Sequence, residues 1–256
     1  MLATLSLLTS LVSLALLLIV AYKVRRLHIA MFELTDKTRA IHQESKVGYS
    51  QIQAYLDLTR LLKLEHPLPT LRNWAASPDF LLIISQHALK HKPTTIVECS
   101  SGASTVVLAR CAQLNGAGHV YSLEHGPQFA AITRQNLENA GLSEWATVID
   151  APLIQLAELP EHRWYSTEGL GDISNIDMVV VDGPPATTCK LARYPALPML
   201  EGRLSDLSHL FMDDAARPEE TEMVRRWIAE RDQGKISAVQ IPCEKGCAVL
   251  SFNRRP

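Results

Sequence analysis

One stretch of the sequence, Asp177–Asp182, constrains the fold more than any other. Its central residues, Met178 to Val181, are all apolar. A strand with an apolar side chain at every position has to be buried on both faces, which is typical of a parallel sheet covered by helices. This stretch therefore predicts a central strand of a layered α/β core.

Strand and helix patterns alternate along the rest of the chain from residue 78 onward. Apolar and β-branched runs predict strands, and apolar residues at helical spacing predict helices. The expected strands are Thr94–Ser100, His119–Glu124, Ala146–Asp150, Asp177–Asp182, Leu207–Asp213, Ile236–Pro242 and Ala248–Asn253. The expected helices are Pro78–Lys90, Ser104–Leu114, Pro127–Ala140 and Pro218–Arg231. The fold class is α/β, with a mostly parallel sheet and helices on both faces.

Residues 1–22 contain no charged residue and are dominated by Leu, Val, Ile and Ala. At about 1.5 Å per residue, a helix of this length crosses a hydrocarbon core of roughly 30 Å. Lys23, Arg25 and Arg26 follow directly, which is the reverse of the charge order in a cleaved secretory signal. The sequence therefore predicts one uncleaved N-terminal transmembrane helix. A buried core helix and a cleaved signal are the alternatives.

The basic residues after this segment also predict its orientation. Positive charges favour the cytoplasmic side of a membrane, so we expect a single-pass membrane protein with its N-terminus outside and the following domain in the cytoplasm. An odd count of five cysteines argues against a disulfide framework and fits a reducing compartment. We expect a helical linker of one or two amphipathic helices at residues 23–66 and a single domain at residues 67–256.

The charge balance bears on the class of partner. The formal net charge is -2 at pH 7, which gives no electrostatic attraction for a polyanion. No nucleic-acid partner is therefore expected. The oligomeric state cannot be read from the sequence.

Polar residues follow the carboxyl ends of the predicted strands, where a doubly wound sheet binds its ligands. The first group is the turn from Glu98 to Thr105, where small residues let a ligand approach the backbone and a helix start offers free N–H groups. A dinucleotide fingerprint needs the spacing G-x-G-x-x-G, and only Gly102 is present, so a nicotinamide-dependent oxidoreductase is disfavoured. A plain capped turn is the alternative for this segment. Glu124 ends the next strand, where a carboxylate can accept both hydroxyls of a ribose.

The third group consists of Asp182, Asp213 and Asp214, at the ends of two strands that should be neighbours. Three carboxylates suit Mg²⁺, which prefers oxygen ligands and keeps several waters. Such an ion would lower the pKa of a substrate hydroxyl and fix its position. The alternative is that Asp213 and Asp214 cap the following helix and pair with Arg217.

Several of these motifs together resemble class I S-adenosylmethionine-dependent methyltransferases. The motifs are Ile96-Val97-Glu98, the Ser/Gly turn to Ser104-Thr105, Tyr121 to His125, and Val179 to Pro185. Three further segments resemble the small-molecule branch called methyltransferase family 24, namely Trp74 to Asp79, Arg193 to Pro198, and Asp213-Asp214 with Arg217 and Glu219. The resemblance spans about Leu68 to Asn253 and implies a Rossmann-like seven-stranded sheet.

The resemblance implies that the cofactor is S-adenosylmethionine. Glu98 would hold the amino group of its methionine moiety, Glu124 its ribose, and Asp150 and Ala151 would flank its adenine. The full set of cofactor-binding residues would be Glu98, Ser100, Gly102, Ser104, Thr105, Glu124, His125, Asp150, Ala151 and Asp182. Asp182 and Asp213 would be catalytic, and Asp182, Asp213 and Asp214 would bind the metal. Ser100 departs from the family, which usually has a glycine there, and this puts the cofactor affinity in doubt.

The implied reaction is transfer of a methyl group from the sulfonium to a hydroxyl oxygen, with Mg²⁺ as an assisting ion. The acceptor would be a small molecule, a glycan or a lipid-linked compound, the last two being suggested only by the expected anchor. The alternative from another class is a noncatalytic, membrane-tethered binding or scaffold protein that keeps the same fold.

Overall fold

The structure is a computed structural model that describes residues 2–71, 75–231 and 235–254. The chain divides into two units, Met1–Ser50 and Gln51–Pro256. Helix α1 (Leu2–Leu62) forms the first unit as far as Ser50, and its last turns, from Gln51 onward, belong to the second unit. Trp74, which opens one of the family-24 motifs, lies outside the described residues.

Helix α1 is continuous, so the segment expected to form one or two separate linker helices is part of the N-terminal helix. Its apolar stretch is interrupted by hydroxyl side chains such as Ser10 and Ser13, and it gives way within the same helix to Lys23, Arg25 and Arg26. Within the described part of the chain, no helix is both long and apolar enough to cross a membrane. The predicted transmembrane helix at residues 1–22 is therefore wrong. The single-pass topology, with the N-terminus outside and the domain in the cytoplasm, is wrong with it because it depended on that helix.

The second unit is built around a seven-stranded sheet in the order β3-β2-β1-β6-β7-β9-β8. Its strands are β1 (Thr95–Cys99), β2 (His119–Glu124), β3 (Ala146–Asp150), β6 (Ile176–Val181), β7 (Leu204–Met212), β8 (Ile236–Ile241) and β9 (Cys247–Asn253). The strands from β3 through β7 in this order are parallel, whereas β9 runs antiparallel to β7 and β8. The expected Rossmann-like sheet is confirmed. The chain winds outward in both directions from β1 and β6, so the switch point lies between these two strands.

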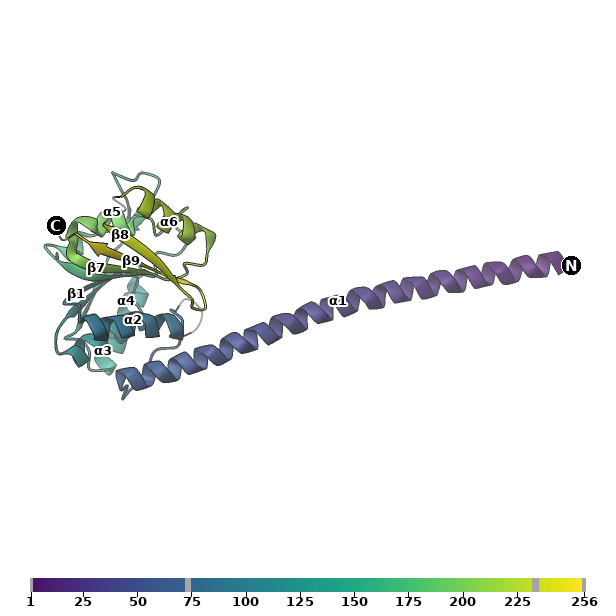
Figure 1. Cartoon of the computed structure of the whole chain (residues 1–256), viewed down its shortest axis with the longest axis horizontal. Helices are drawn as coiled ribbons and strands as arrows, with labels where there is room; N and C mark the ends of the chain where they lie inside the picture. The colour runs from purple at the N-terminus through teal and green to yellow at the C-terminus, as the bar shows by residue number, and fades with distance from the viewer. Residues whose placement is uncertain (1, 72–74, 232–234, 255–256) are drawn as a thin grey trace. The chain divides into compact units, whose positions relative to one another are not determined.

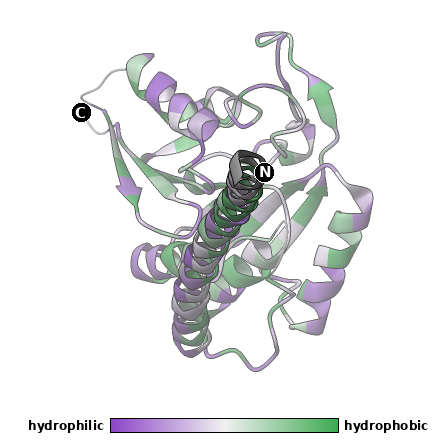
Figure 2. Ribbon diagram, turned by 90° about the vertical axis from the view of Figure 1, so that its right-hand side faces the viewer, coloured by the Kyte–Doolittle hydropathy of each residue, from purple (hydrophilic) through white to green (hydrophobic). Residues whose placement is uncertain are grey.

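Helices cover both faces of the sheet (Figure 1). The first face carries α2 (Pro78–His91), α3 (Ala103–Asn115) and α4 (Pro127–Asn139), and the second carries α5 (Ala196–Leu200) and α6 (Pro218–Ala229). Short 3₁₀ helices occur at Glu168–Leu170 (η1) and Glu201–Arg203 (η2). The central strands are largely hydrophobic, as Figure 2 shows, because helices bury them from both sides.

The end of α1 is part of the core on the first face. Leu58 and Leu62 are fully buried against α2 and α3, and burial of a leucine side chain stabilises a fold by about 1.5–3 kcal/mol. Asp79, near the start of α2, accepts hydrogen bonds from Gln51 of α1 and from the backbone N–H of Glu244 in the β8–β9 turn, both at 2.7 Å. These contacts attach the last turns of α1 to the domain.

A short hairpin between β3 and β6 is absent from the sequence-based expectation. It pairs β4 (Leu153–Gln155) with β5 (Arg163–Tyr165) in an antiparallel two-stranded sheet. Strands this short do not give a recognisable alternation of apolar and polar residues. The hairpin matters because Trp164 and Tyr165 of β5 are buried in the core of the second face.

The turn after β1 holds Ser100 at φ +109°, in a backbone region that favours glycine. Its backbone is fixed on both sides, since its N–H donates to Leu123 O at 3.0 Å and its carbonyl accepts from Ser122 Oγ at 2.6 Å. A side chain in such a conformation costs roughly 1–3 kcal/mol and persists only where the surroundings enforce it. The structure thus gives the physical reason why a glycine is usual at this position.

We predict that Ser100→Gly stabilises the domain. Glycine removes the steric penalty but increases the entropy of the unfolded chain, so the expected net gain is about 1 kcal/mol, or roughly 2–4 °C in Tm. Thermal unfolding followed by circular dichroism measures this change. The matched control is Ser101→Gly, at a neighbouring serine without a positive φ, which should not raise the Tm. An unchanged or lower Tm for Ser100→Gly would contradict the claim that the backbone at Ser100 is strained.

Candidate functional site

The predicted site residues lie at the carboxyl ends of the parallel strands, on both sides of the switch point. The parallel ladder continues one residue beyond the strands, because Asp182 N donates to Cys99 O at 3.2 Å and Asp213 N donates to Val181 O at 3.0 Å. In the register of β2 and β3, Glu124 pairs with Asp150. The sheet therefore brings the residues from five separate segments to one edge.

Glu98, near the end of β1, is fully buried. Its Oε2 accepts hydrogen bonds from Thr105 Oγ1 at 2.5 Å and from Ser122 Oγ at 2.9 Å. Its Oε1 has no partner among the described residues. Burial, only partly offset by the hydroxyl donors, raises the pKa of the Glu98 carboxyl to about 7. A buried oxygen without a partner can accept a hydrogen bond from a ligand.

The turn after Glu98 leads directly into helix α3. Gly102 N donates to Thr105 Oγ1 at 3.0 Å, and Ser104 and Thr105 are buried in the first helical turn. The first backbone N–H groups of a helix lack intrahelical acceptors and favour an anion. The predicted roles of Ser100, Gly102 and Ser104 are compatible with this position and stay predictions.

Glu124 at the end of β2 is already held by the protein. Its Oε2 accepts from the backbone N–H of Ser101 at 3.0 Å and from Ser101 Oγ at 2.9 Å, and its Oε1 accepts from Gly126 N at 2.9 Å. A carboxylate has about four lone-pair sites, so capacity for a ligand remains. The Ser101 hydroxyl also lies 3.1 Å from Thr133 Oγ1, which gives it a second partner if a ligand takes its place.

The residues predicted to lie around the ribose and adenine are less buried. The side chain of His125 is 31% exposed, and its Nδ1 lies 3.2 Å from Glu124 Oε1. Asp150 faces solvent and pairs with Arg134 of α4 at 2.9 Å, while the neighbouring Ala151 is buried. Their predicted roles are not tested by these contacts.

Asp182, Asp213 and Asp214 form the acidic cluster at the ends of β6 and β7. One carboxylate oxygen from each lies within 4.8 Å of the other two. Burial, together with the charge of Asp213, raises the pKa of Asp182 well above its usual value, and burial with Asp214 raises that of Asp213 to about 6. Asp213 Oδ2 and Asp214 Oδ1 are buried without a hydrogen-bond partner among the described residues. These oxygens have the chemistry to receive a cation or a hydroxyl proton.

Arg193, from the segment between β6 and α5, enters this cluster. Its Nη2 donates to Asp214 Oδ2 at 2.8 Å and lies 3.5 Å from Asp182 Oδ1, and its Nη1 donates to Asp213 O at 2.9 Å. The guanidinium is buried, so it compensates part of the negative charge in a region that water does not screen. The sequence analysis placed Arg193 in a motif but did not predict that it pairs with the aspartates. Its distance from them along the chain gives no sign of this contact.

Asp214 also bonds to Arg217 at 2.9 Å, as the alternative interpretation of the cluster expected. That interpretation also made Asp213 and Asp214 the cap of the following helix. Helix α6 starts at Pro218, however, with Arg217 at its N-cap. The two aspartates therefore do not cap α6, and they directly follow the end of β7.

Tyr165 of the β4–β5 hairpin reaches the same edge of the sheet and was not predicted. It is 1% exposed, and a Cβ placed on Gly183 would overlap its hydroxyl. Its ring centroid lies 5.8 Å from that of His125. Burial, with smaller contributions from Cys99 and Glu124, raises the pKa of the phenol well above its usual value, so the hydroxyl stays protonated. The aromatic pair Trp164-Tyr165 is typical of strands, but it is too short to predict one by itself.

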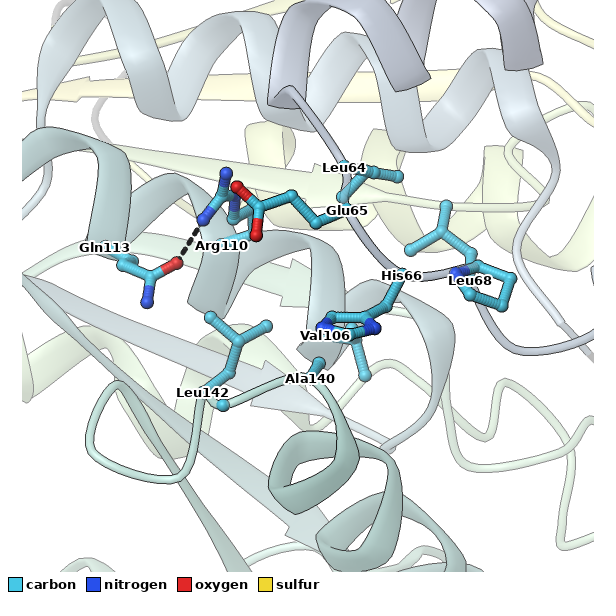
Figure 3. A pocket seen from close by; sticks show the side chains of 11 residues that line it. Leu64, Glu65, His66, Leu68, Val106, Arg110, Gln113, Ala140 and Leu142 are labelled. Carbon is cyan, nitrogen blue, oxygen red and sulfur yellow. Dashed lines mark hydrogen bonds between the residues drawn. The ribbon is translucent and has the colours of Figure 1, made fainter.

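A separate pocket of about 230 Å³ lies beside helix α3 (Figure 3). It is lined by the segment after α1, including His66, and by α3, including Arg110. Arg110 bonds to Gln113 and donates to the carbonyls of Leu62 at 3.0 Å and Lys63 at 2.9 Å. The pocket contains none of the predicted site residues, and Arg110 serves there to hold the end of α1.

Comparison with known proteins agrees with the resemblance seen in the sequence. Residues 97–215 match the family model of a methyltransferase domain, family 24. No curated protein matches the sequence.

Solved structures give the same fold at low sequence identity. A methyltransferase of Podospora anserina with bound S-adenosylhomocysteine is 15% identical, with a TM-score of 0.59 over 83% of this chain and 96% of that one. An O-methyltransferase of Bacillus cereus in complex with S-adenosylhomocysteine is 21% identical, with a TM-score of 0.53 over 80% and 91%. The O-methyltransferase TomG of Streptomyces achromogenes, in complex with S-adenosylmethionine, is 15% identical, with a TM-score of 0.52 over 79% and 89%.

These likenesses concern the fold, whereas the family match concerns the sequence of the segment that carries Glu98, Glu124, Asp182 and Asp213. The family match and the shared fold both agree with the resemblance drawn from the sequence motifs, which is confirmed. Residues 97–215 match a methyltransferase domain of family 24, and the fold is that of the class I S-adenosylmethionine-dependent methyltransferases.

Proposed function

We propose that this protein transfers a methyl group from S-adenosylmethionine to a hydroxyl oxygen of a small molecule. The observation that carries the proposal is the arrangement of buried carboxylates around the switch point. Glu98 and Glu124 lie at the ends of adjacent strands β1 and β2, and Asp182 and Asp213 lie at the ends of β6 and β7. Glu98 and Glu124 suit the cofactor, and Asp182 and Asp213 suit the acceptor.

The cofactor side of the proposal follows from the donors and acceptors that each residue presents. S-adenosylmethionine supplies an activated methyl group on a sulfonium. The unpartnered Oε1 of Glu98 is suited to its amino group, and the N–H groups at the start of α3 are suited to its carboxylate. Glu124 would accept the ribose hydroxyls in place of the Ser101 hydroxyl.

The acceptor side requires a base next to the reacting oxygen. A lone pair of the acceptor oxygen forms the new C–O bond while the C–S bond breaks. The electron pair of the C–S bond stays on sulfur, which gives S-adenosylhomocysteine. The hydroxyl proton has to leave, and Asp213 Oδ2, which is buried without a partner among the described residues, can accept it when no cation is bound to that oxygen. Positioning of the two reactants supplies much of the rate of such a displacement.

A divalent cation is a second element of the proposal. Asp182, Asp213 and Asp214 offer oxygen ligands within 4.8 Å of one another, and two buried oxygens of the cluster lack partners. These residues would hold Mg²⁺, which when bound lowers the pKa of a coordinated hydroxyl. Arg193 already neutralises part of the cluster, so the cation would share Asp182 and Asp214 with the guanidinium.

The proposed acceptor is a small molecule, as the resemblance of the sequence motifs to methyltransferase family 24 implies. The glycan and lipid-linked acceptors depended on the transmembrane helix and are not retained. The rival function is a noncatalytic binding protein that keeps the fold without the cofactor. It predicts a folded protein with no affinity for S-adenosylmethionine, which a binding measurement decides.

We predict that Glu124→Gln weakens binding of S-adenosylmethionine to the full-length chain about tenfold or more. The neutral amide loses charge-assisted hydrogen bonds to the ribose, each contributing roughly 1.5–3 kcal/mol. Calorimetric titration measures the Kd. The matched control is Glu138→Gln, an exposed glutamate on α4, which should bind like the wild type. Equal affinity of Glu124→Gln and the wild type for S-adenosylmethionine would contradict the proposal that Glu124 binds the ribose.

We predict that Mg²⁺ binds to the full-length chain and that Asp213→Asn weakens this binding about tenfold or more, because the amide removes one anionic oxygen ligand from the cluster. Titration with MgCl₂ alone tests it, with the exposed Asp172→Asn as the matched control. If the wild type shows no saturable binding, the metal is removed from the proposal. Methyl transfer with Asp213 as base would then stand without it.

A further inference from the structure

We propose that the Tyr165 hydroxyl contacts the sulfonium end of the bound cofactor and favours S-adenosylmethionine over S-adenosylhomocysteine. The proposal rests on the methyltransferase function proposed above. It assigns a role in ligand selection to a residue of the β4–β5 hairpin, which lies outside the parallel sheet.

The position of the hydroxyl is fixed by its neighbours at the switch point. A Cβ on Gly183 would overlap the Tyr165 hydroxyl and would also come within 2.9 Å of Ser100 Cβ and 3.3 Å of Cys99 O. The hydroxyl therefore lies beside both the turn after β1 and the segment after β6. Only the absence of a side chain at Gly183 leaves room for it.

The hydroxyl also has an unmet hydrogen-bonding requirement. Its oxygen is buried and has no hydrogen-bond partner among the described residues, whereas a buried hydroxyl normally finds one. The side chain is 1% exposed, so neither bulk water nor a ligand reaches its oxygen until a neighbouring side chain at the switch point shifts. A ligand at the switch point would supply the missing partner.

The chemistry of the cofactor identifies which part of it comes here. In S-adenosylmethionine the sulfur joins the methionine moiety to the ribose. The methionine is proposed to lie at the turn that contains Ser100, and the ribose at Glu124. Tyr165 lies between these two places, because its hydroxyl is beside Gly183 and Ser100 while its ring faces His125, next to Glu124.

The polarity of the hydroxyl determines which form of the cofactor it prefers. S-adenosylmethionine carries a positive sulfonium whose methyl hydrogens attract oxygen lone pairs, and S-adenosylhomocysteine has a neutral thioether. An oxygen that accepts these weak C–H contacts stabilises the charged substrate and not the neutral product. Such a preference assists product release as well as substrate binding.

The ring is held in place by packing, which makes the oxygen a fixed feature of the site. Trp164 packs edge-on against Tyr165 with a centroid distance of 5.0 Å. The backbone N–H of Ser166 donates to Pro152 O at 2.9 Å, which ties the end of β5 to the segment after β3. The Tyr165→Phe variant keeps these contacts and removes one oxygen.

The test compares affinities for both forms of the cofactor in the full-length wild type, Tyr165→Phe and the control Tyr121→Phe. Tyr121 lies in β2 and is partly buried. Calorimetric titration gives the Kd of S-adenosylmethionine and of S-adenosylhomocysteine for each protein. Thermal unfolding checks that each variant is folded. For Tyr165→Phe we expect a three- to tenfold weaker affinity for S-adenosylmethionine and less than a twofold change for S-adenosylhomocysteine.

Each alternative outcome counts against the inference in a recognisable way. Equal weakening for both compounds would show a packing role and overturn the selective contact. Unchanged affinity for both, or the same loss of selectivity in Tyr121→Phe, would also overturn it while leaving the proposed function in place. If the wild type binds neither compound, the proposed function fails and the inference fails with it.

Discussion

Parallel strands end at the same edge of a sheet, and this constraint determines where the charged groups of the site lie. Asp182 follows β6 and Asp213 follows β7, and backbone hydrogen bonds extend the ladder to both residues. Glu98 and Glu124 belong to β1 and β2 at the same edge. Four carboxyl groups far apart in the sequence are thereby collected around the switch point between β1 and β6. The sheet itself brings these carboxyl groups together, without the movement of a loop.

Collecting carboxylates in a buried place has an energetic cost, and the fold offsets it locally. Glu98 accepts hydrogen bonds from Thr105 and Ser122, and Arg193 donates to Asp214 within the acidic cluster. Removal of one partner from a buried ion pair typically costs about 3–5 kcal/mol, so Arg193 stabilises the fold as well as the site. Among the described residues, the buried carboxylate oxygens without partners belong to Glu98, Asp213 and Asp214, and they are the carboxyl groups proposed to meet ligands.

The sequence was sufficient to predict the sheet because its central strands are long apolar runs with acidic residues at their ends. The strand predicted at Asp177–Asp182 corresponds to β6 (Ile176–Val181), and the strand predicted at His119–Glu124 to β2. The acidic cluster was predictable for the same reason, since Asp182, Asp213 and Asp214 directly follow buried strands.

Three features were not predictable by this reasoning. Arg193 meets the aspartates only through tertiary structure, and nothing in its local sequence indicates burial. The β4–β5 hairpin is too short for a periodic signal, so Tyr165 was missed with it. The N-terminal segment was predicted to be a separate membrane span from its lack of charge. The structure instead has one continuous helix to Leu62, and no described stretch of it is long and apolar enough to cross a membrane.

The account depends most on the claim that the cofactor lies across the ends of β1 and β2. A crystal structure of the full-length chain with S-adenosylhomocysteine tests that claim directly. The account predicts the methionine amino group at Glu98, the ribose hydroxyls at Glu124 and the sulfur beside Tyr165. Density for the compound at another place, such as the pocket beside Arg110, with an unoccupied turn at Ser100 to Ser104, would contradict the account.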